Sequence, residues 1–295
     1  YFYPEITSTG KEKYLAFYQE VVNRTVDMIV EWQRVGFVHG VMNTDNMSIL
    51  GLTIDYGPYG WLEDYNPDWT PNTTDAEGRR YRFRNQPDIA LWNLVQLGNA
   101  LYPLIEDIAS MEQVLNSYSQ QFDSQFPILQ QQKLGLQAEY DAHFQDELIT
   151  LLTASETDMT IFYRNLANVV KTDTSDEALA KIEVAFYQPD KIVTTLKTSW
   201  LNWMELYLEK IKAEVLSDEE RKQAMNTINP KYVLRNYMAQ LAIEAAEKED
   251  YSIIDELYTL LKNPYDEQSQ YEKWFAKRPD WARHKVGCSM LSCSS

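Results

Sequence analysis

The change of sequence pattern after residue 34 limits the possible folds more than any other feature of the chain. Apolar residues follow helical spacing over residues 12–34, and the pattern then changes abruptly. Residues 47–50 and 52–54 flank Gly51, which predicts a tight pair of strands. Residues 56–88 are rich in Gly, Pro, Asn, Asp, Tyr and Trp and have no period. They predict a long loop, and loops of this length are usually functional.

The chain beyond Pro87 is predicted to be almost entirely helical. Asp88 is a candidate helix N-cap, and Asn229-Pro230 has the pattern of a cap followed by proline in the first turn. Residues 110–113 and 217–220 have the pattern of capping boxes. The fold class is therefore α+β, mostly helical with a short β-hairpin. The predicted helices cover residues 110–132, 139–153, 156–170, 175–185, 191–213, 217–227, 230–247 and 252–262, and the core aromatics are Trp200, Trp203, Tyr207 and Tyr237.

Charge and cysteine usage exclude several classes of protein. The net charge of −17 disfavours a nucleic-acid partner, because phosphate binding needs clustered Lys and Arg. No apolar run approaches the ~18 residues that a membrane helix needs, so no membrane span is predicted. The cysteines, Cys288 and Cys293, both lie near the end of the chain. This excludes a core disulfide framework and is typical of a reducing compartment.

The order of motifs before the long loop is that of a protein kinase catalytic lobe. In kinases, His-Arg-Asp, four further residues and Asn form the catalytic loop, and Asp-Phe-Gly follows. When His39 is aligned with the kinase His, Asn46 falls on the metal-binding Asn and residues 55–57 (Asp-Tyr-Gly) fall on Asp-Phe-Gly. Val41 falls on the catalytic Asp, and it can accept no proton. The nearest carboxylate in the loop, Asp45, is therefore the candidate base.

These residue types suit transfer of a group from ATP. Such transfer needs a divalent cation, and Mg²⁺ prefers oxygen ligands and keeps several waters. Asn46 and Asp55 supply an amide and a carboxylate oxygen, and Asp45 can orient or deprotonate an attacking hydroxyl. Taken singly, each motif is more often a capped turn, and only their combination and order favour a site. His39 is more simply a packed structural residue.

The unbroken segment 36–58 resembles the selenoprotein O family, including its bacterial members. Residues 83–87 with 90–94, residues 229–237 and the final Cys293-Ser294-Ser295 resemble further segments of that family. The resemblance implies a protein-kinase-like fold that binds ATP in an inverted orientation. AMP, with UMP as an open alternative, is then transferred to Ser, Thr or Tyr of a protein, and pyrophosphate leaves.

The resemblance also implies roles for individual residues. Asp45 is expected as the proton acceptor, and Asn46 and Asp55 are expected as ligands of Mg²⁺ or Mn²⁺. Asp55 is also expected to lie against the phosphates of ATP. The family favours a redox role for Cys293, paired with Cys288 or with a partner molecule, and the alternative is two thiols on a frayed terminus.

The resemblance further suggests how the chain is organised. Residues 1–171 are expected to form the C-lobe of the kinase-like unit, residues 172–287 a helical extension and residues 288–295 a cysteine-containing tail. The first 35 residues contain no nucleotide-covering loop and no phosphate-binding Lys with its Glu partner. We therefore expect the N-lobe to be missing from this chain, and the chain alone to bind ATP poorly.

Two other functions remain open at this level. A kinase-fold phosphotransferase is weakened by Val41, and an inactive pseudokinase scaffold is weakened by the retention of Asn46 and Asp55. The expected partners are ATP and proteins that carry Ser, Thr or Tyr. The protein is expected to be a monomer and to act in the bacterial cytoplasm or in a mitochondrion. Four arginines in the long loop either face phosphates or an acidic substrate, or form packing ion pairs: Arg79, Arg80, Arg82 and Arg84.

Overall fold

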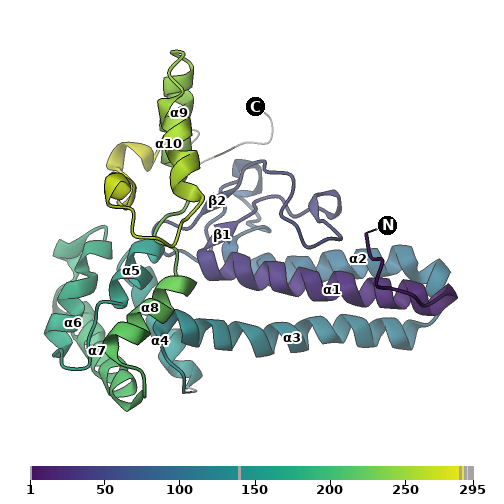
Figure 1. Ribbon diagram of the computed structural model, residues 1–295, viewed down its shortest axis with the longest axis horizontal. Helices are drawn as coiled ribbons and strands as arrows, with labels where there is room; N and C mark the ends of the chain where they lie inside the picture. The colour runs from purple at the N-terminus through teal and green to yellow at the C-terminus, as the bar shows by residue number, and fades with distance from the viewer. Residues whose placement is uncertain (1, 139–140, 286–287, 289–290, 292–295) are drawn as a thin grey trace.

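The molecule is mainly helical, with one small antiparallel sheet (Figure 1). The computed structural model describes residues 2–138, 141–285, 288 and 291. Its helices are α1 (Gly10–Val35), α2 (Gln86–Ile105), α3 (Ile108–Leu134), α4 (Ala142–Ala154), α5 (Met159–Leu166), α6 (Ser175–Ile182), α7 (Thr194–Ala213), α8 (Asp218–Ile228), α9 (Asn236–Ala246) and α10 (Ser252–Leu261). The strands are β1 (Phe37–Val38) and β2 (Gly60–Trp61). Short 3₁₀ turns include η1 (Thr44–Asn46), η2 (Thr73–Asp75), η3 (Phe83–Asn85) and η6 (Ser269–Trp274).

The long helices α1, α2 and α3 lie side by side and form the elongated part of the molecule (Figure 1). Their facing apolar side chains make one core, which includes Tyr18, Val22 and Ile29. Helix α1 ends at Gly36, which has φ 75°. A Cβ there would lie 2.8 Å from the sulfur of Met159, so both the backbone angle and the packing require glycine. This turn directs the chain into β1.

The sheet is not where the sequence predicts it. Strand β1 pairs with β2, with Phe37 opposite Trp61, so the two strands enclose the loop between them. Residues 47–54, all within the described part of the chain, contain a turn and no strand pair, so the predicted pairing is wrong. The turn closes with the Gly51 N–H bonded to Ser48 O at 3.2 Å. Gly51 has φ 66° and packs against the backbone of Arg24 on α1, which takes the place of a strand partner.

The sequence predicts some helix starts correctly and others wrongly. The capping box at Ser217 and Glu220 is confirmed at α8. The box predicted at residues 110–113 is wrong, because Asp107 caps α3 by accepting the Ser110 N–H at 3.2 Å. Helix α2 already begins at Gln86, so Asp88 lies in its first turn and is not its cap.

The cap predicted at Asn229-Pro230 is also wrong, since α9 begins only at Asn236. Tertiary contacts hold residues 229–235 out of the helix. The N–H groups of Lys231 and Tyr232 both donate to Pro264 O, at 2.8 and 3.0 Å. Contacts made far along the chain thus override the local helix signal.

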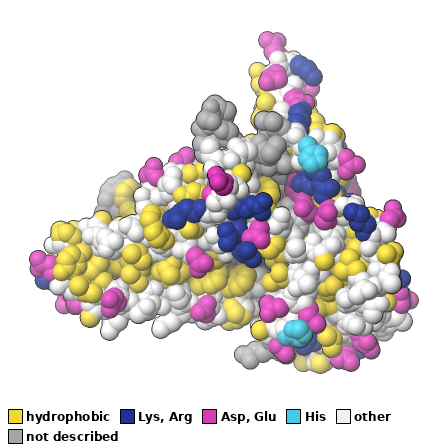
Figure 2. Space-filling view, turned by 180° about the vertical axis from the view of Figure 1, so that it is seen from behind, with side chains coloured by type: hydrophobic (Ala, Val, Ile, Leu, Met, Phe, Trp, Pro, Cys, Tyr) yellow, Lys and Arg dark blue, Asp and Glu magenta, His cyan; other side chains and the backbone are white. Residues whose placement is uncertain are grey.

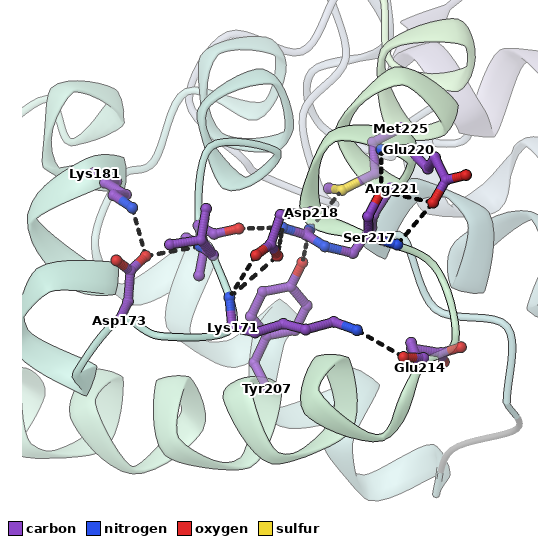
Figure 3. Close-up of polar contacts among 12 residues, drawn as sticks. Lys171, Asp173, Lys181, Tyr207, Glu214, Ser217, Asp218, Glu220, Arg221 and Met225 are labelled. Atoms are coloured by element: carbon purple, nitrogen blue, oxygen red, sulfur yellow. Dashed lines mark hydrogen bonds and ion pairs between the residues drawn. The ribbon is translucent and has the colours of Figure 1, made fainter.

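A second core joins α4 to α8 with the loop after β2. The predicted core residues Trp200, Trp203 and Tyr207 are confirmed, each at most 1% exposed. Arg221 is fully buried beside them, and its guanidinium donates to Tyr207 Oη at 3.1 Å and to the Val169 carbonyl (Figure 3). The same core contains residues on both sides of position 171, and the division of the chain there stays a prediction.

A third core holds α9, α10 and the end of the chain together. It includes Tyr237, confirmed as a buried residue, with Leu260, Trp274 and Cys288. Helices α9 and α10 stand out from the rest of the molecule in Figure 1. On the face that Figure 2 shows, Lys and Arg side chains gather near the middle, where the elongated part meets the rest. None of the helices in the described part of the chain combines the length and apolar character needed to cross a membrane.

Candidate active site

Asp45 lies on the 3₁₀ turn η1, three residues after the buried Met42, and is exposed. The turn is fixed by the Asn46 N–H, which donates to Asn43 O at 3.0 Å. The Asn43 side chain is held in turn by Tyr81, whose hydroxyl donates to Asn43 Oδ1 at 2.5 Å. Among the described residues, no cation lies within ion-pair distance of the Asp45 carboxylate. The carboxylate is therefore free to act on an incoming group.

Asn46 is oriented by its own loop. Its Nδ2 donates to Val41 O at 3.0 Å. This bond uses the amide nitrogen, and within the described part of the chain no hydrogen bond to Oδ1 is present. An amide oxygen oriented in this way is a suitable ligand for a hard cation.

Asp55 sits in an unusual backbone conformation. Its φ is 56°, in the left-handed region that Asp tolerates better than most residues. Its carbonyl accepts the Gly57 N–H at 2.8 Å, which closes a three-residue turn. The side chain is exposed, and no cation among the described residues pairs with it. The turn therefore fixes the backbone beneath the carboxylate and leaves its oxygens free.

His39 connects the segment that carries Asp45 with the one that carries Asp55. It is 1% exposed and stacks on Trp32 with ring centroids 5.4 Å apart. Its Nε2 lies 2.8 Å from Ile54 O, and its Nδ1 accepts the Val41 N–H at 3.4 Å. A carbonyl can only accept, so the ring is neutral with the proton on Nε2. Burial lowers the pKa of His39, although Ile54 O and the Asp55 charge partly oppose this shift.

Three side-chain amides hold the same loop from behind, and we call them, with His39, the amide cradle. Gln86 accepts the His39 N–H at 2.9 Å and donates to Phe37 O at 2.8 Å. The other two amides each donate to a loop carbonyl: Asn93 to Met42 O at 2.9 Å and Asn72 to Gly40 O at 3.1 Å. All members of the cradle are at most 6% exposed. The cradle thus fixes the loop by neutral hydrogen bonds to its backbone.

The close packing of the loop explains one glycine. Gly40 has φ 78°, and a Cβ there would lie 2.2 Å from Pro58 O. No side chain fits in that space. The segment before Asp45 and the segment after Asp55 are therefore in close contact at Gly40 and Pro58.

The chemistry of the donor set fits a divalent cation. Asn46 and Asp55 supply the oxygen types that Mg²⁺ and Mn²⁺ prefer. Within the residues described, no group of three or more His, Cys, Asp or Glu side chains is placed to hold a metal. One amide and one carboxylate would need further oxygens, and phosphates supply them.

The structure reveals residues that hold the candidate loop and that the sequence did not single out. Gln86, Asn93, Asn72 and Tyr81 all contact the loop through side-chain hydrogen bonds. Gln86 and Asn93 fall within the family-like segments 83–87 and 90–94, and this was the only signal for them. Nothing local pointed to Asn72 or Tyr81.

A second cluster of polar side chains contains Glu63 from the long loop. We call it the ionic cluster, and its members are Glu63, Asp158, Arg235 and Arg278. Arg235 is 2% exposed and binds both oxygens of Asp158, at 2.7 and 2.9 Å. Arg278 binds Glu63 at 2.9 Å. Burial raises the pKa of Glu63 to about 7, although Arg235 and Arg278 oppose this shift.

The two cysteines lie far along the sequence from Asp45 and Asp55, and only Cys288 is among the described residues. Cys288 is a free thiol, 3% exposed, in the third core. Burial raises the pKa of this thiol, which lowers its thiolate fraction and its reactivity. Cys293 lies outside the described residues. A redox role for either one stays a prediction.

Comparison with known proteins gives a consistent result. The model of a family described as "Protein adenylyltransferase SelO" matches residues 1–262. A Flavobacterium johnsoniae protein called "Protein nucleotidyltransferase YdiU" is 59% identical over all of this chain, and the match covers 57% of that protein. Proteins of the same name from Rhodopirellula baltica and Aromatoleum aromaticum are 50% and 47% identical over 97% and 99% of the chain. The matches cover 55% and 56% of these relatives, so the chain spans little more than half their length.

Proposed function

The chain belongs to the SelO family, and from this premise we propose that it supplies the proton-accepting and metal-binding part of a protein adenylyltransferase active site. In this proposal the fold is kinase-like, and AMP passes from ATP to a Ser, Thr or Tyr hydroxyl of a protein. The relatives come from bacteria, which supports action in the bacterial cytoplasm.

One observation supports this function most strongly. His39 bonds the carbonyl of Ile54 while Gln86 bonds the His39 N–H, so the turn with Asp55 and the loop with Asp45 are held to one another. Among the residues that the structure describes, none pairs with the carboxylates of Asp45 and Asp55 or bonds to the Asn46 amide oxygen, so these oxygens can meet other groups. A rigid backbone beneath free oxygens is what positioning of a nucleotide requires.

The proposed reaction moves one proton and exchanges one bond. The acceptor hydroxyl oxygen attacks the α-phosphorus of ATP, and the bond from that phosphorus to the bridging oxygen breaks. Pyrophosphate leaves with the electrons of that bond. Asp45 accepts the hydroxyl proton, a role that typically contributes about 10²–10⁴-fold to rate. Bound between Asn46, Asp55 and the phosphates, Mg²⁺ or Mn²⁺ would offset their negative charge.

Val41 argues against phosphotransfer by the usual kinase arrangement. It stands where kinases carry the catalytic Asp, and its backbone N–H is already bonded to His39. Asp45 is the carboxylate closest to it in the loop sequence. We propose that the residues that clamp the nucleotide lie in the part of the relatives' length that this chain does not span, so the chain alone transfers AMP negligibly.

Labelled ATP tests the proposal. A full-length family protein that contains this sequence is incubated with a protein mixture and ATP labelled at the α- or the γ-phosphate. Label only from the α-position is expected, and Asp45→Ala and Asp55→Ala should each abolish it. Label transferred only from the γ-phosphate would show that the protein is a phosphotransferase. No label from either position would favour an inactive scaffold.

A further inference from the structure

Within the described part of the chain, Arg80 has no acidic partner, and its guanidinium lies over an exposed aromatic ring. Its guanidinium carbon lies 4.7 Å from the ring centre of Trp92, which is 43% exposed. Asp75 fixes the backbone below it by accepting the N–H groups of Arg80 and Tyr81, at 2.8 and 2.7 Å. Stacking occupies one face of a guanidinium and leaves its edge donors available for a carboxylate.

The neighbouring arginines differ in how their charge is neutralised. Arg82 and Arg84 share one carboxylate, Asp68, at 3.0 and 2.7 Å. In the described part of the chain, no carboxylate lies within ion-pair distance of Arg79 or Arg80. These two exposed cations are adjacent in the long loop of a chain whose net charge is −17.

A short series of contacts connects Arg80 to the candidate base. The next residue, Tyr81, donates its hydroxyl to Asn43 Oδ1 at 2.5 Å, and Asn43 precedes η1, which carries Asp45. Trp92, on which Arg80 stacks, precedes Asn93, which holds Met42 O from the same loop. The cationic surface is thus built onto the loop that carries Asp45.

We propose that Arg79 and Arg80 bind acidic side chains that flank the acceptor hydroxyl of a protein substrate. This inference rests on the proposed transfer to protein and names the substrate class. The overall charge of −17 repels an acidic protein, so recognition of acidic residues needs a local cationic surface. The planar edge of Arg80 suits a carboxylate in two-point contact.

Direct binding tests this inference without any nucleotide. The probe is a fluorescein-labelled eight-residue peptide with one serine flanked by four glutamates, compared with the same peptide carrying four glutamines. Fluorescence polarisation with this chain at low salt should show the glutamate peptide binding at least about tenfold more tightly, since a charged hydrogen-bonded pair is worth roughly that much. Equal affinity for the two peptides would overturn the inference.

Three variants locate the binding surface. Arg79→Gln with Arg80→Gln should remove most of the preference for glutamate. Arg80→Lys should keep part of it, because the charge remains but the planar guanidinium over Trp92 is lost. Lys212→Gln, which removes one positive charge at an exposed position on α7, should leave the preference intact.

Each alternative outcome is decisive. A loss of preference in Lys212→Gln equal to that in the arginine variants would show diffuse electrostatics and contradict the inference. Circular dichroism of each variant confirms that it is folded. In the full-length protein, the arginine variants should raise the KM for an acidic peptide and leave the KM for ATP unchanged, whereas a raised KM for ATP would assign the arginines to the nucleotide. If AMP transfer fails altogether but the glutamate preference persists, only the proposed function is wrong.

Discussion

The amide cradle and the ionic cluster are two buried polar groups that hold loops in opposite ways. The cradle uses neutral side chains such as Gln86, and each of its members bonds to the backbone between Phe37 and Ile54. The ionic cluster uses full charges, with Arg235 bound to both oxygens of Asp158. The first holds a loop whose own carboxylates are free, and the second joins segments far apart in the sequence.

The two groups show how the backbone of a site can be held rigidly while its carboxylates stay available to a cation or a proton. A charged partner near Asp45 or Asp55 would satisfy the carboxylate and compete with a cation or a proton. Neutral bonds to the backbone fix the same loop and leave these carboxylates unpaired. Charges are concentrated instead in the ionic cluster, where Arg235 pairs with Asp158 and Arg278 pairs with Glu63.

The largest expected effect comes from breaking the ionic cluster. Arg235→Met leaves the buried Asp158 carboxylate without its bidentate partner. We expect the free energy of unfolding of the chain to fall by about 3–5 kcal/mol, because an uncompensated buried charge is costly. Urea unfolding followed by circular dichroism measures this.

The matched control neutralises both members of that pair. Asp158→Asn combined with Arg235→Met should recover part of the loss, since Asn can still cap α5 at the Ile161 N–H. A loss below about 1 kcal/mol for Arg235→Met alone would show that the ionic cluster does not join the segments.

A smaller loss is expected from the amide cradle. Gln86→Met leaves the His39 N–H and the Phe37 carbonyl unpaired, which should cost about 2–3 kcal/mol. The loss should be nearly the same at pH 6 and pH 8, because no charge is removed. Gln96→Met, on the same helix, is the control and should change stability by less than about 0.5 kcal/mol. A pH-dependent loss would contradict the neutral character of the cradle.

The pH dependence of stability gives a third comparison. Burial raises the pKa of Glu63 to about 7, so the folded chain holds a proton that the unfolded chain loses near pH 4.5. Stability from this group is therefore present at low pH and is lost as pH rises towards 7, by about 2 kcal/mol between pH 5 and 7. Glu63→Gln should flatten the profile of unfolding free energy in this range. An unchanged slope would show that Glu63 does not titrate there.

His39 should act with the opposite sign and a smaller amplitude. Burial lowers its pKa below 6.5, so the unfolded chain takes up the proton first as pH falls. Its contribution to stability is present above pH 6.5 and is lost as pH falls below that value. His39→Gln should remove this slope. A slope that steepens in the variant would mean that the buried ring is charged in the folded chain.

The helices could be predicted from sequence, because apolar spacing and capping residues act locally. The box at Ser217 is an example, with both of its reciprocal bonds formed. Failures occurred where distant contacts decide. Residues 229–235 lie outside the helix, with the N–H groups of Lys231 and Tyr232 bonded to Pro264 O. Residues 47–54 form no strand pair, and Gly51 packs against α1 instead.

The candidate site divides in the same way. Asp45, Asn46 and Asp55 could be named because their order within eleven residues follows a known pattern. The amides that hold the loop could not, because Asn72 and Asn93 are 32 and 51 residues from their acceptors. In the ionic cluster, Glu63 and Arg278 are 215 residues apart, and no periodic pattern connects residues at that distance.

Binding of Mn²⁺ tests most directly whether the loop held by the cradle receives a cation at Asp55. In a full-length family protein with ATP present, bound Mn²⁺ is measured by electron paramagnetic resonance for the wild type, Asp55→Ala and Asp45→Ala. We predict that Asp55→Ala weakens Mn²⁺ binding at least about tenfold, while Asp45→Ala binds Mn²⁺ as the wild type does and fails only in transfer. Unchanged Mn²⁺ affinity in Asp55→Ala would contradict the account.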